Sequence, residues 1–274
     1  DGDKQDINVL QHVLGMSITG STKERLVFLL YGQGSNGKGV LFKVLGNIFG
    51  TYHIGISEST FSNKYLDIPK QMYKFIGKRI ASVAELSSGS NFNEAFLKQF
   101  VGGDEFTVRG LYKEEMKFLP KVTLWLSSND AVQLRYTPAI KERLVVLPCT
   151  RQFTDTNLDI HLIDKLLQER EGILKWFIEG ARKWYACTKD GSSIRTLLPD
   201  SWRKATEDYW RECDTVKSFL DTCCLFSPEA RVKSMDLYNN YCAWAAHEDL
   251  DDVSLTTFGK RIKQTYKKIG SEYI

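Results

Sequence analysis

Residues 25–49 read RLVFLLYGQGSNGKGVLFKVLGNIF, and this stretch decides the fold. Its first part, Arg25–Tyr31, is a short apolar run of the kind that forms a central strand covered on both faces of a parallel sheet. Its last part, Val40–Phe49, has apolar residues at helical spacing. A strand, a glycine-rich loop and a helix in this order are the surroundings that a phosphate-binding loop requires. The stretch therefore predicts that the loop binds the phosphates of a nucleotide.

The loop itself has the spacing Gly32-x-x-x-x-Gly37-Lys38. Glycines let backbone N–H groups turn inward around a β-phosphate, and Lys38 would neutralise charge on the β- and γ-phosphates. The next position usually has Ser or Thr, whose hydroxyl ligates Mg²⁺, but here it is Gly39. The alternative is a glycine-rich turn without a ligand. The positions expected to touch ATP are Gly32, Gly34, Ser35, Asn36, Gly37, Lys38, Gly39 and Val40.

Further apolar runs predict the rest of the core. Ile80–Ala84, Lys121–Leu126 and Arg143–Pro148 are typical of buried strands, and they alternate with helical patterns. This alternation predicts an α/β fold with a mainly parallel sheet. Phe106–Lys117 alternates around Gly110 and predicts a hairpin.

Helical patterns flank this core on both sides. Residues 7–18 predict a helix, and from about residue 155 the chain is helical again, with candidates at Leu158–Leu167 and Gly172–Tyr185. We therefore expect the following division of the chain: an N-terminal helical segment at 1–24, the core at 25–150, a helical extension at 151–200 and a last domain at 201–274.

Polar residues follow two of the predicted strands. Glu85 stands at the end of one strand, where an acid could activate water and hold Mg²⁺ directly or through water. Asn129 follows another and could sense a γ-phosphate. Because the ends of parallel strands converge on one edge of a sheet, both residues are candidates for the site of Lys38. The alternatives are a surface Glu at a strand end and an ordinary turn Asn.

A cation is also needed where charge builds up during phosphoryl transfer. Arg143 precedes the strand LVVLP, and arginine suits bidentate contact with phosphate. Arg135 is a weaker candidate. The alternative is that Arg143 is a surface residue paired with Glu142 or Asp130.

Two basic clusters could contact nucleic acid. The hairpin has Arg109, Tyr112 and Lys113, in which cations and an aromatic ring suit a single strand, although Glu114 and Glu115 dilute the charge. Residues 258–268, FGKRIKQTYKK, contain Lys260 and Arg261 and no acid, and they predict an amphipathic helix with one basic side. The hairpin could equally be a solvated surface. The helix is a candidate recognition helix, and its alternative is again a solvated surface.

Composition narrows the class of protein. With 42% hydrophobic and 26% charged residues, the chain is expected to fold as a soluble protein, and a net charge of +3 does not by itself point to nucleic acid. The six cysteines form no C-x-x-C pair and read as reduced thiols. The four histidines have no partners at metal spacing. Without a long apolar run, we expect no membrane contact and a cytoplasmic location. The chain begins at Asp1 without Met, as a fragment of a longer protein would.

Taken in order, these motifs resemble those of superfamily 3 helicases, and in particular the primase–helicases of phages, plasmids and poxviruses. The resemblance covers nearly the whole chain, including FLDTCC, LYNNYCAWA and LTTFGKRI in its last third. The segments of the core that carry it are GQGSNGKG at 32–39, GKRIASVAEL at 77–86, residues 93–115, LPKVTLWLSSND at 119–130 and PAIKERLVVLP at 138–148.

The resemblance implies an AAA+ ATPase core that assembles as a hexameric ring, with ATP and Mg²⁺ at the subunit interfaces. Lys38 and Glu85 would act in one subunit, and Arg143 would reach in from its neighbour. The hairpin at about 104–118 would face the pore and grip one DNA strand through Arg109 and Lys113. Residues 201–274 would form a winged-helix-like domain. Unwinding would run 3′ to 5′, and a primase domain or partner would accompany the module.

Two departures from the family pattern affect the metal. Gly39 replaces the usual hydroxyl, and Glu85 is preceded by Ala84, so Mg²⁺ is expected to be held through waters and the phosphates. The main hypothesis is an ATP-dependent DNA helicase. The alternatives are a DNA-binding initiator or loader that ATP switches without translocation, and a phosphate-loop protein that acts on a small molecule.

Overall fold

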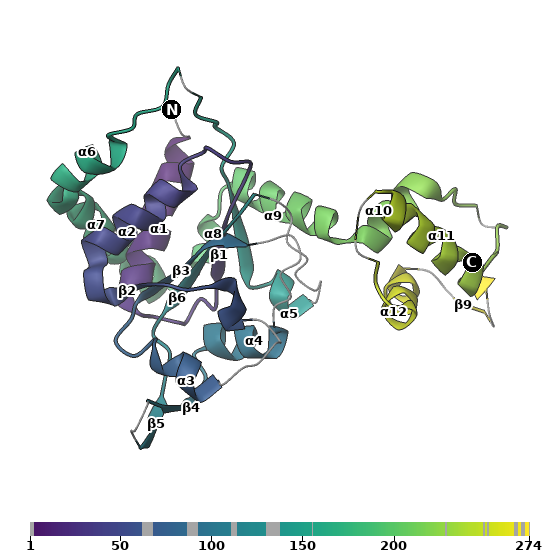
Figure 1. Cartoon of the computed structure of the whole chain (residues 1–274), viewed down its shortest axis with the longest axis horizontal. Helices are drawn as coiled ribbons and strands as arrows, with labels where there is room; N and C mark the ends of the chain where they lie inside the picture. Colours follow the sequence, from purple (N-terminus) through teal and green to yellow (C-terminus); the bar gives the residue numbers. More distant parts are fainter. Residues whose placement is uncertain are drawn as a thin grey trace. The chain divides into compact units, whose positions relative to one another are not determined.

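A computed structural model describes residues 3–61, 68–86, 93–110, 114–129, 138–154, 156–227, 229–248, 250, 252–265, 268–269 and 272–273. The chain divides into two compact units, Asp1–Tyr209 and Trp210–Ile274 (Figure 1). The division falls within a helix, α9 (Asp200–Cys213). In the part of the chain that is described, no helix has the length and apolar character needed to cross a membrane.

A five-stranded sheet forms the centre of the first unit, in the order β2-β3-β6-β1-β7, and every pairing in it is parallel. This confirms the predicted parallel sheet. β1 begins at Val27, later than predicted, because Arg25 adopts a left-handed φ of 53° that a strand excludes. The bounds are β1 (Val27–Tyr31), β2 (His53–Gly55), β3 (Ile80–Leu86), β6 (Thr123–Ser128) and β7 (Leu144–Pro148).

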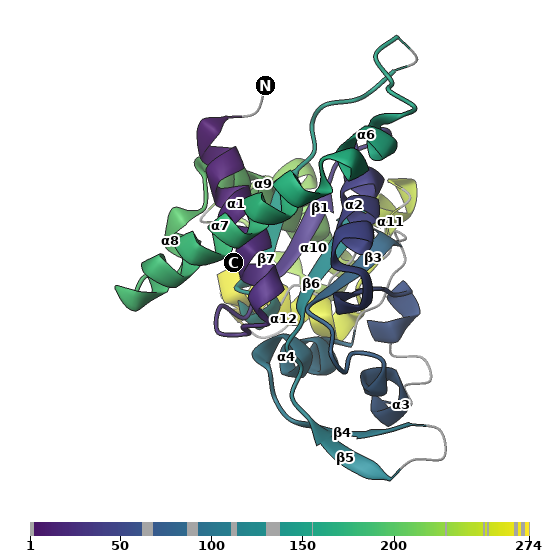
Figure 2. The same ribbon diagram turned by 90° about the vertical axis from the view of Figure 1, so that its left-hand side faces the viewer.

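Helices cover the sheet on both sides. On one face α1, α2 and α7 lie together (Figures 1 and 2), and their apolar residues share one core with the strands. The helices besides α9 are α1 (Lys4–Thr19), α2 (Lys38–Phe49), α3 (Ile68–Tyr73), α4 (Glu94–Gly102), α5 (Pro138–Lys141), α6 (Leu162–Gln168), α7 (Arg170–Lys189) and α8 (Ile194–Leu197), with 3-10 turns η1 (Gly50–Tyr52) and η2 (Glu58–Phe61).

Helices α1 and α7 cross at two glycines, Gly15 and Gly180. A Cβ at Gly180 would overlap the backbone carbonyl of Gln11, and a Cβ at Gly15 would overlap the backbone between Gly180 and Ala181. The two backbones approach this closely only because neither glycine has a side chain. The first helix is therefore packed into the core of the first unit, where Val9, Val13 and Leu14 are buried.

Polar contacts fix the helices to the central strands. Trp125 of β6 stacks on Phe28 of β1 at 4.8 Å and donates through its indole to Ser17 Oγ of α1 at 3.1 Å. The buried Glu24, just before β1, accepts from the Trp184 indole at 3.1 Å and from the Ile194 N–H at 3.2 Å. A buried carboxylate that is this well hydrogen-bonded holds α7 and α8 against the start of β1.

The predicted hairpin is confirmed as β4 (Phe106–Arg109) paired antiparallel with β5 (Glu115–Phe118). Phe106 and Val108 are buried on one face, and Phe106 meets Phe96 of α4 at 5.8 Å. Thr107 and Arg109 alternate with them and are exposed. The residues between the strands that could contact DNA, Tyr112 and Lys113, lie outside the described residues.

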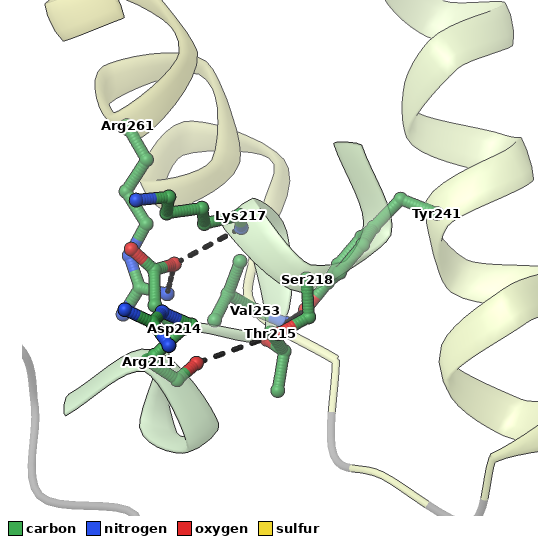
Figure 3. Close-up of polar contacts among 8 residues, drawn as sticks. All are labelled: Arg211, Asp214, Thr215, Lys217, Ser218, Tyr241, Val253 and Arg261. Atoms are coloured by element: carbon green, nitrogen blue, oxygen red, sulfur yellow. Dashed lines mark hydrogen bonds and ion pairs between the residues drawn. The ribbon is translucent and has the colours of Figure 1, made fainter. Parts of the chain in front are cut away.

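The second unit contains α10 (Thr215–Cys223), α11 (Ser234–His247) and α12 (Leu255–Thr265) with a three-stranded antiparallel sheet. The strands β8 (Val232–Lys233), β9 (Lys268–Ile269) and β10 (Glu272–Tyr273) are ordered β8-β10-β9. The ring of Tyr241 is fully buried, and its hydroxyl lies 2.7 Å from Thr215 Oγ1 and accepts from the Val253 N–H at 3.1 Å (Figure 3). This hydroxyl joins α10 and α11 to the segment that precedes α12. All six cysteines of the chain are free thiols.

Candidate functional site

The glycine loop leaves the carboxyl end of β1 and enters α2, as predicted. Gly32 has a φ of 151°, and a Cβ there would overlap the carbonyl oxygen of Cys149, so only glycine fits. The loop is anchored to the segment after β7: Asn36 Nδ2 donates to Cys149 O at 3.1 Å, and Phe153 N–H donates to Ser35 O at 2.7 Å. These hydrogen bonds with the segment after β7 stabilise the conformation of the loop.

Lys38 is the buried cation of this loop, with 7% of its surface exposed. Its ammonium donates to Gly32 O, to Gln33 O at 3.3 Å and to Asn129 Oδ1 at 2.9 Å. Burial lowers the pKa of Lys38, and the charges of Cys149 and Glu85 oppose that shift. A phosphate oxygen could take the place of these acceptors, because each is a neutral oxygen and a phosphate is charged.

Glu85 joins the same group of side chains. β3 has an irregular register between Val83 and Leu86, and Ala84 and Glu85 are exposed at this point. An irregularity of this kind can re-aim a side chain. Asn129 Nδ2 donates to Glu85 Oε1 at 3.1 Å, while Asn129 Oδ1 accepts from Lys38. Three predicted residues from three parts of the sequence therefore form one hydrogen-bonded chain.

A cavity of about 640 Å³ opens beside the hydrogen-bonded side chains of Lys38, Asn129 and Glu85. Its size suits a nucleotide-sized ligand. The predicted residues that line it are Gly34, Ser35, Asn36, Gly37, Lys38, Gly39, Val40, Glu85 and Asn129. The other lining residues, which no sequence pattern predicted, are Lys43, Ala84, Ser127, Phe153, Asn157, Leu158, Asp159 and Leu162.

The lining residues that the sequence did not predict include one residue of a predicted strand and several residues of the segment after β7. Ser127 of β6 lies two residues before Asn129, which follows the strand, so strand alternation alone could have placed the two on the same side. Phe153–Leu162 follows β7, and only the sheet order shows that β7 lies beside β1. No local pattern in this segment signals a ligand.

Arg143 lies away from the cavity of its own chain. It precedes β7, and its carbonyl accepts from the Val27 N–H at 2.8 Å, at the start of β1. The glycine loop leaves the other end of β1, and a five-residue strand is about 16 Å long. The backbone around Arg143 is fixed by Arg195, which donates to the carbonyls of Glu142 and Glu24. Arg135 lies outside the described residues.

The described cations of the hairpin face glutamates. Arg109 is paired in register with Glu115, and Lys117 forms an ion pair of 2.8 Å with Glu105. The hydrogen bond and charge of Glu105 raise the pKa of the exposed Lys117 ammonium. The described part of the hairpin is thus close to charge balance.

In the second unit the predicted basic residues Lys260 and Arg261 differ in their surroundings. Lys260 is exposed on α12. Arg261 is mostly buried and donates to Asp214 Oδ1 at 3.1 Å, and the same oxygen accepts from the Lys217 N–H at 3.2 Å (Figure 3). Arg261 therefore fastens α12 to the start of α10, and only its remaining N–H donors are available to a partner.

Within the described ranges, no group of three or more His, Cys, Asp or Glu side chains is arranged to hold a metal.

Comparison with protein families gives two matches. Residues 30–143, which contain the glycine loop, Glu85 and Asn129, match a family of unknown function, DUF5906. Residues 211–274, which make up nearly all of the second unit, match the "Poxvirus D5 protein-like" family.

The chain is similar to two curated viral proteins. It is 25% identical over 272 residues to "Putative helicase L207/L206" of Acanthamoeba polyphaga mimivirus, covering 88% of this chain and 27% of that protein. It is 23% identical over 251 residues to "Putative helicase 022R" of Frog virus 3 (isolate Goorha), covering 84% of this chain and 25% of that protein. The chain thus spans about a quarter of the length of these relatives.

A solved structure shares the fold. The A form apo structure of the NrS-1 C terminal region aligns with a TM-score of 0.52 at 14% identity, covering all of this chain and 75% of that one. This likeness shows a shared fold, and the likeness in sequence is to two viral proteins that are named putative helicases.

Proposed function

We propose that this chain is an ATP-dependent DNA helicase module of superfamily 3, from a replication protein of a virus, phage, plasmid or other mobile element. The observation that carries the proposal is the hydrogen-bonded chain Lys38–Asn129–Glu85 beside a nucleotide-sized cavity. Two relatives that are named as helicases support it. The core would be of the AAA+ type and the direction of unwinding 3′ to 5′.

In this proposal the cavity binds ATP with Mg²⁺. The loop from Gly32 to Val40 wraps the phosphates, and Lys38 neutralises their charge. Glu85 activates the attacking water and holds the metal through water. Asn129 contacts the γ-phosphate. These roles use a cation and a carboxylate that are each hydrogen-bonded to the amide of Asn129.

The position of Arg143 supports a homo-oligomer, which we propose to be a hexameric ring. Arg143 lies at the start of β7, whereas the cavity lies at the carboxyl edge of the sheet. A cation for the transition state of phosphoryl transfer would then come from the neighbouring subunit.

DNA is the proposed partner of both basic regions. Arg109, Tyr112 and Lys113 of the hairpin would contact one strand in the pore. The second unit would be a winged-helix-like domain, which its three helices and small antiparallel sheet support, and Lys260 and Arg261 of α12 would contact DNA. A primase domain or partner would act with the module, in the cytoplasm of the host cell.

A hairpin variant tests whether ATP turnover is used for unwinding. Arg109→Ala with Lys113→Ala should spare ATP binding and lose displacement of a labelled strand from a forked duplex, because two phosphate contacts are removed. Lys117→Ala is the matched control, since its ammonium is already held by Glu105. Unwinding at the wild-type rate by the double variant would contradict DNA contact by the hairpin and would favour a solvated surface.

The same assay separates the main proposal from an ATP-switched initiator or loader. The near charge balance of the described hairpin favours that second candidate. A loader predicts ATP-dependent DNA binding by the wild-type chain without displacement of a strand at any protein concentration.

Mixed assemblies test the role of Arg143. Arg143→Ala should lower ATP hydrolysis by about 10³-fold or more, because a cation that stabilises the transition state is lost. ATP binding should persist, since Arg143 is remote from the cavity of its own chain. Mixing this variant with Glu85→Gln should restore part of the activity, because some interfaces then combine an intact Glu85 with an intact Arg143. If no mixing ratio restores hydrolysis, the role of Arg143 in the neighbouring site is wrong.

A further inference from the structure

Ser127 is a buried hydroxyl residue in the wall of the candidate nucleotide cavity. It lies near the carboxyl end of β6, opposite Leu30 of β1, and only 3% of its surface is exposed. Among the residues that the structure describes, no hydrogen-bond partner takes its side-chain oxygen. This oxygen is not among the fully buried polar atoms without a partner, so it keeps contact with the cavity, where a ligand or water can form a hydrogen bond with it.

Its neighbours in the cavity wall are satisfied. Lys38 and Glu85 are both bound to Asn129, and the hydroxyl of the next residue, Ser128, donates to Leu86 O at 3.4 Å. Ser127 therefore differs from the polar groups around it. A hydroxyl, a carboxylate and an amide oxygen are the hard oxygen donors that suit Mg²⁺ or the waters that it carries.

Gly39 gives the second observation. It lines the same cavity, it is exposed, and a Cβ built there meets nothing within 4 Å. Space therefore does not exclude the Ser or Thr that most phosphate-binding loops have at this position. Position 39 has space for a hydroxyl side chain but holds a glycine. Ser127, in the same cavity wall, has a hydroxyl without a hydrogen-bond partner among the described residues.

We propose that Ser127 supplies to the Mg²⁺ of the bound nucleotide, directly or through the waters of the metal, the hydroxyl that Gly39 lacks. This inference rests on the proposed function, because it assigns a metal-holding residue to the same ATP site. Ser127 acts there with Glu85, and the phosphates provide the remaining oxygens. The opposing possibility is that Ser127 only fills space, as alanine would.

The test compares the Mg²⁺ dependence of nucleotide binding in the full chain. Affinity for a non-hydrolysable ATP analogue is measured by titration calorimetry in EDTA and at increasing Mg²⁺ concentrations. Ser127→Ala should leave the affinity in EDTA unchanged and raise the Mg²⁺ concentration at the midpoint by on the order of tenfold, as for other groups that orient a metal. Ser128→Ala is the matched control and should keep the wild-type midpoint.

Rescue distinguishes a metal role from a general disturbance. Adding Gly39→Thr to Ser127→Ala should return the midpoint toward the wild-type value, because position 39 has space for the side chain. An unchanged midpoint in Ser127→Ala overturns the inference, and so does a shift that Gly39→Thr leaves in place. If the wild-type chain binds no nucleotide with or without Mg²⁺, the proposed function itself fails.

Discussion

Replacing Lys38 with alanine is expected to reduce ATP hydrolysis by about 10²–10³-fold or more, the loss that follows removal of a preorganised group that stabilises transition-state charge. Lys38 is the buried cation of the loop, and its ammonium is already positioned by Gly32, Gln33 and Asn129. A charged phosphate oxygen can replace these neutral acceptors, and the ammonium then lies beside the charge that builds up in the transition state. Its loss would also leave the amide oxygen of Asn129 without this donor.

The measurement is steady-state phosphate release with and without a single-stranded oligonucleotide. Lys74→Ala is the matched control, because it removes the same charge from an exposed side chain that bonds only Gln71 among the described contacts. Melting temperatures of both variants establish that they are folded. Turnover by Lys38→Ala within about threefold of the wild-type value would exclude the assigned nucleotide site.

Replacing Gly180 with alanine should have the largest effect on stability. The added methyl would overlap the backbone carbonyl of Gln11, and neither helix backbone can move without disturbing the core around Val13 and Phe177. Overpacking of this kind costs about 3 kcal/mol of the free energy of unfolding. For a unit of this size, that corresponds to a fall in Tm of roughly 6–12 °C.

Gly172→Ala is the matched control on the same helix. A Cβ at Gly172 meets nothing within 4 Å, so alanine should raise the free energy of unfolding by about 0.5–1 kcal/mol through helix propensity. Thermal unfolding followed by tryptophan fluorescence gives both values. Equal melting temperatures for the two variants would show that the close crossing of α1 and α7 is absent in solution.

The parts of the fold that were predictable are those that local sequence determines. The run from Val27 to Phe49 contains its own strand, loop and helix signals, and the structure confirms the order of these elements. β2 was missed because its residues, His53–Gly55, have no apolar pattern and take strand geometry only through pairing with β3. The sequence predicted the first helix. It could not predict how that helix packs, because the packing depends on Gly180, which lies far from the helix in the sequence.

In the candidate site, too, the residues next to predicted strands could be predicted, and those placed by the order of the strands could not. Lys38, Glu85 and Asn129 each follow or border a recognisable strand, and parallel strands bring them together. The far wall of the cavity, from Phe153 to Leu162, could not be predicted, because it depends on β7 lying beside β1. Strand alternation could have placed Ser127 on the side of Asn129, but only the structure shows that Ser127 lines the cavity.

The amide of Asn129 has a further consequence for how the two ends of the site communicate. Its oxygen accepts from Lys38 and its nitrogen donates to Glu85, and both atoms belong to one rigid plane. If a phosphate draws the lysine away from the oxygen, the same plane is free to turn, and its hold on the glutamate changes with it. A shift of the Lys38 ammonium would therefore change the orientation of the Glu85 carboxylate. The uncharged side chain of Asn129 couples the two.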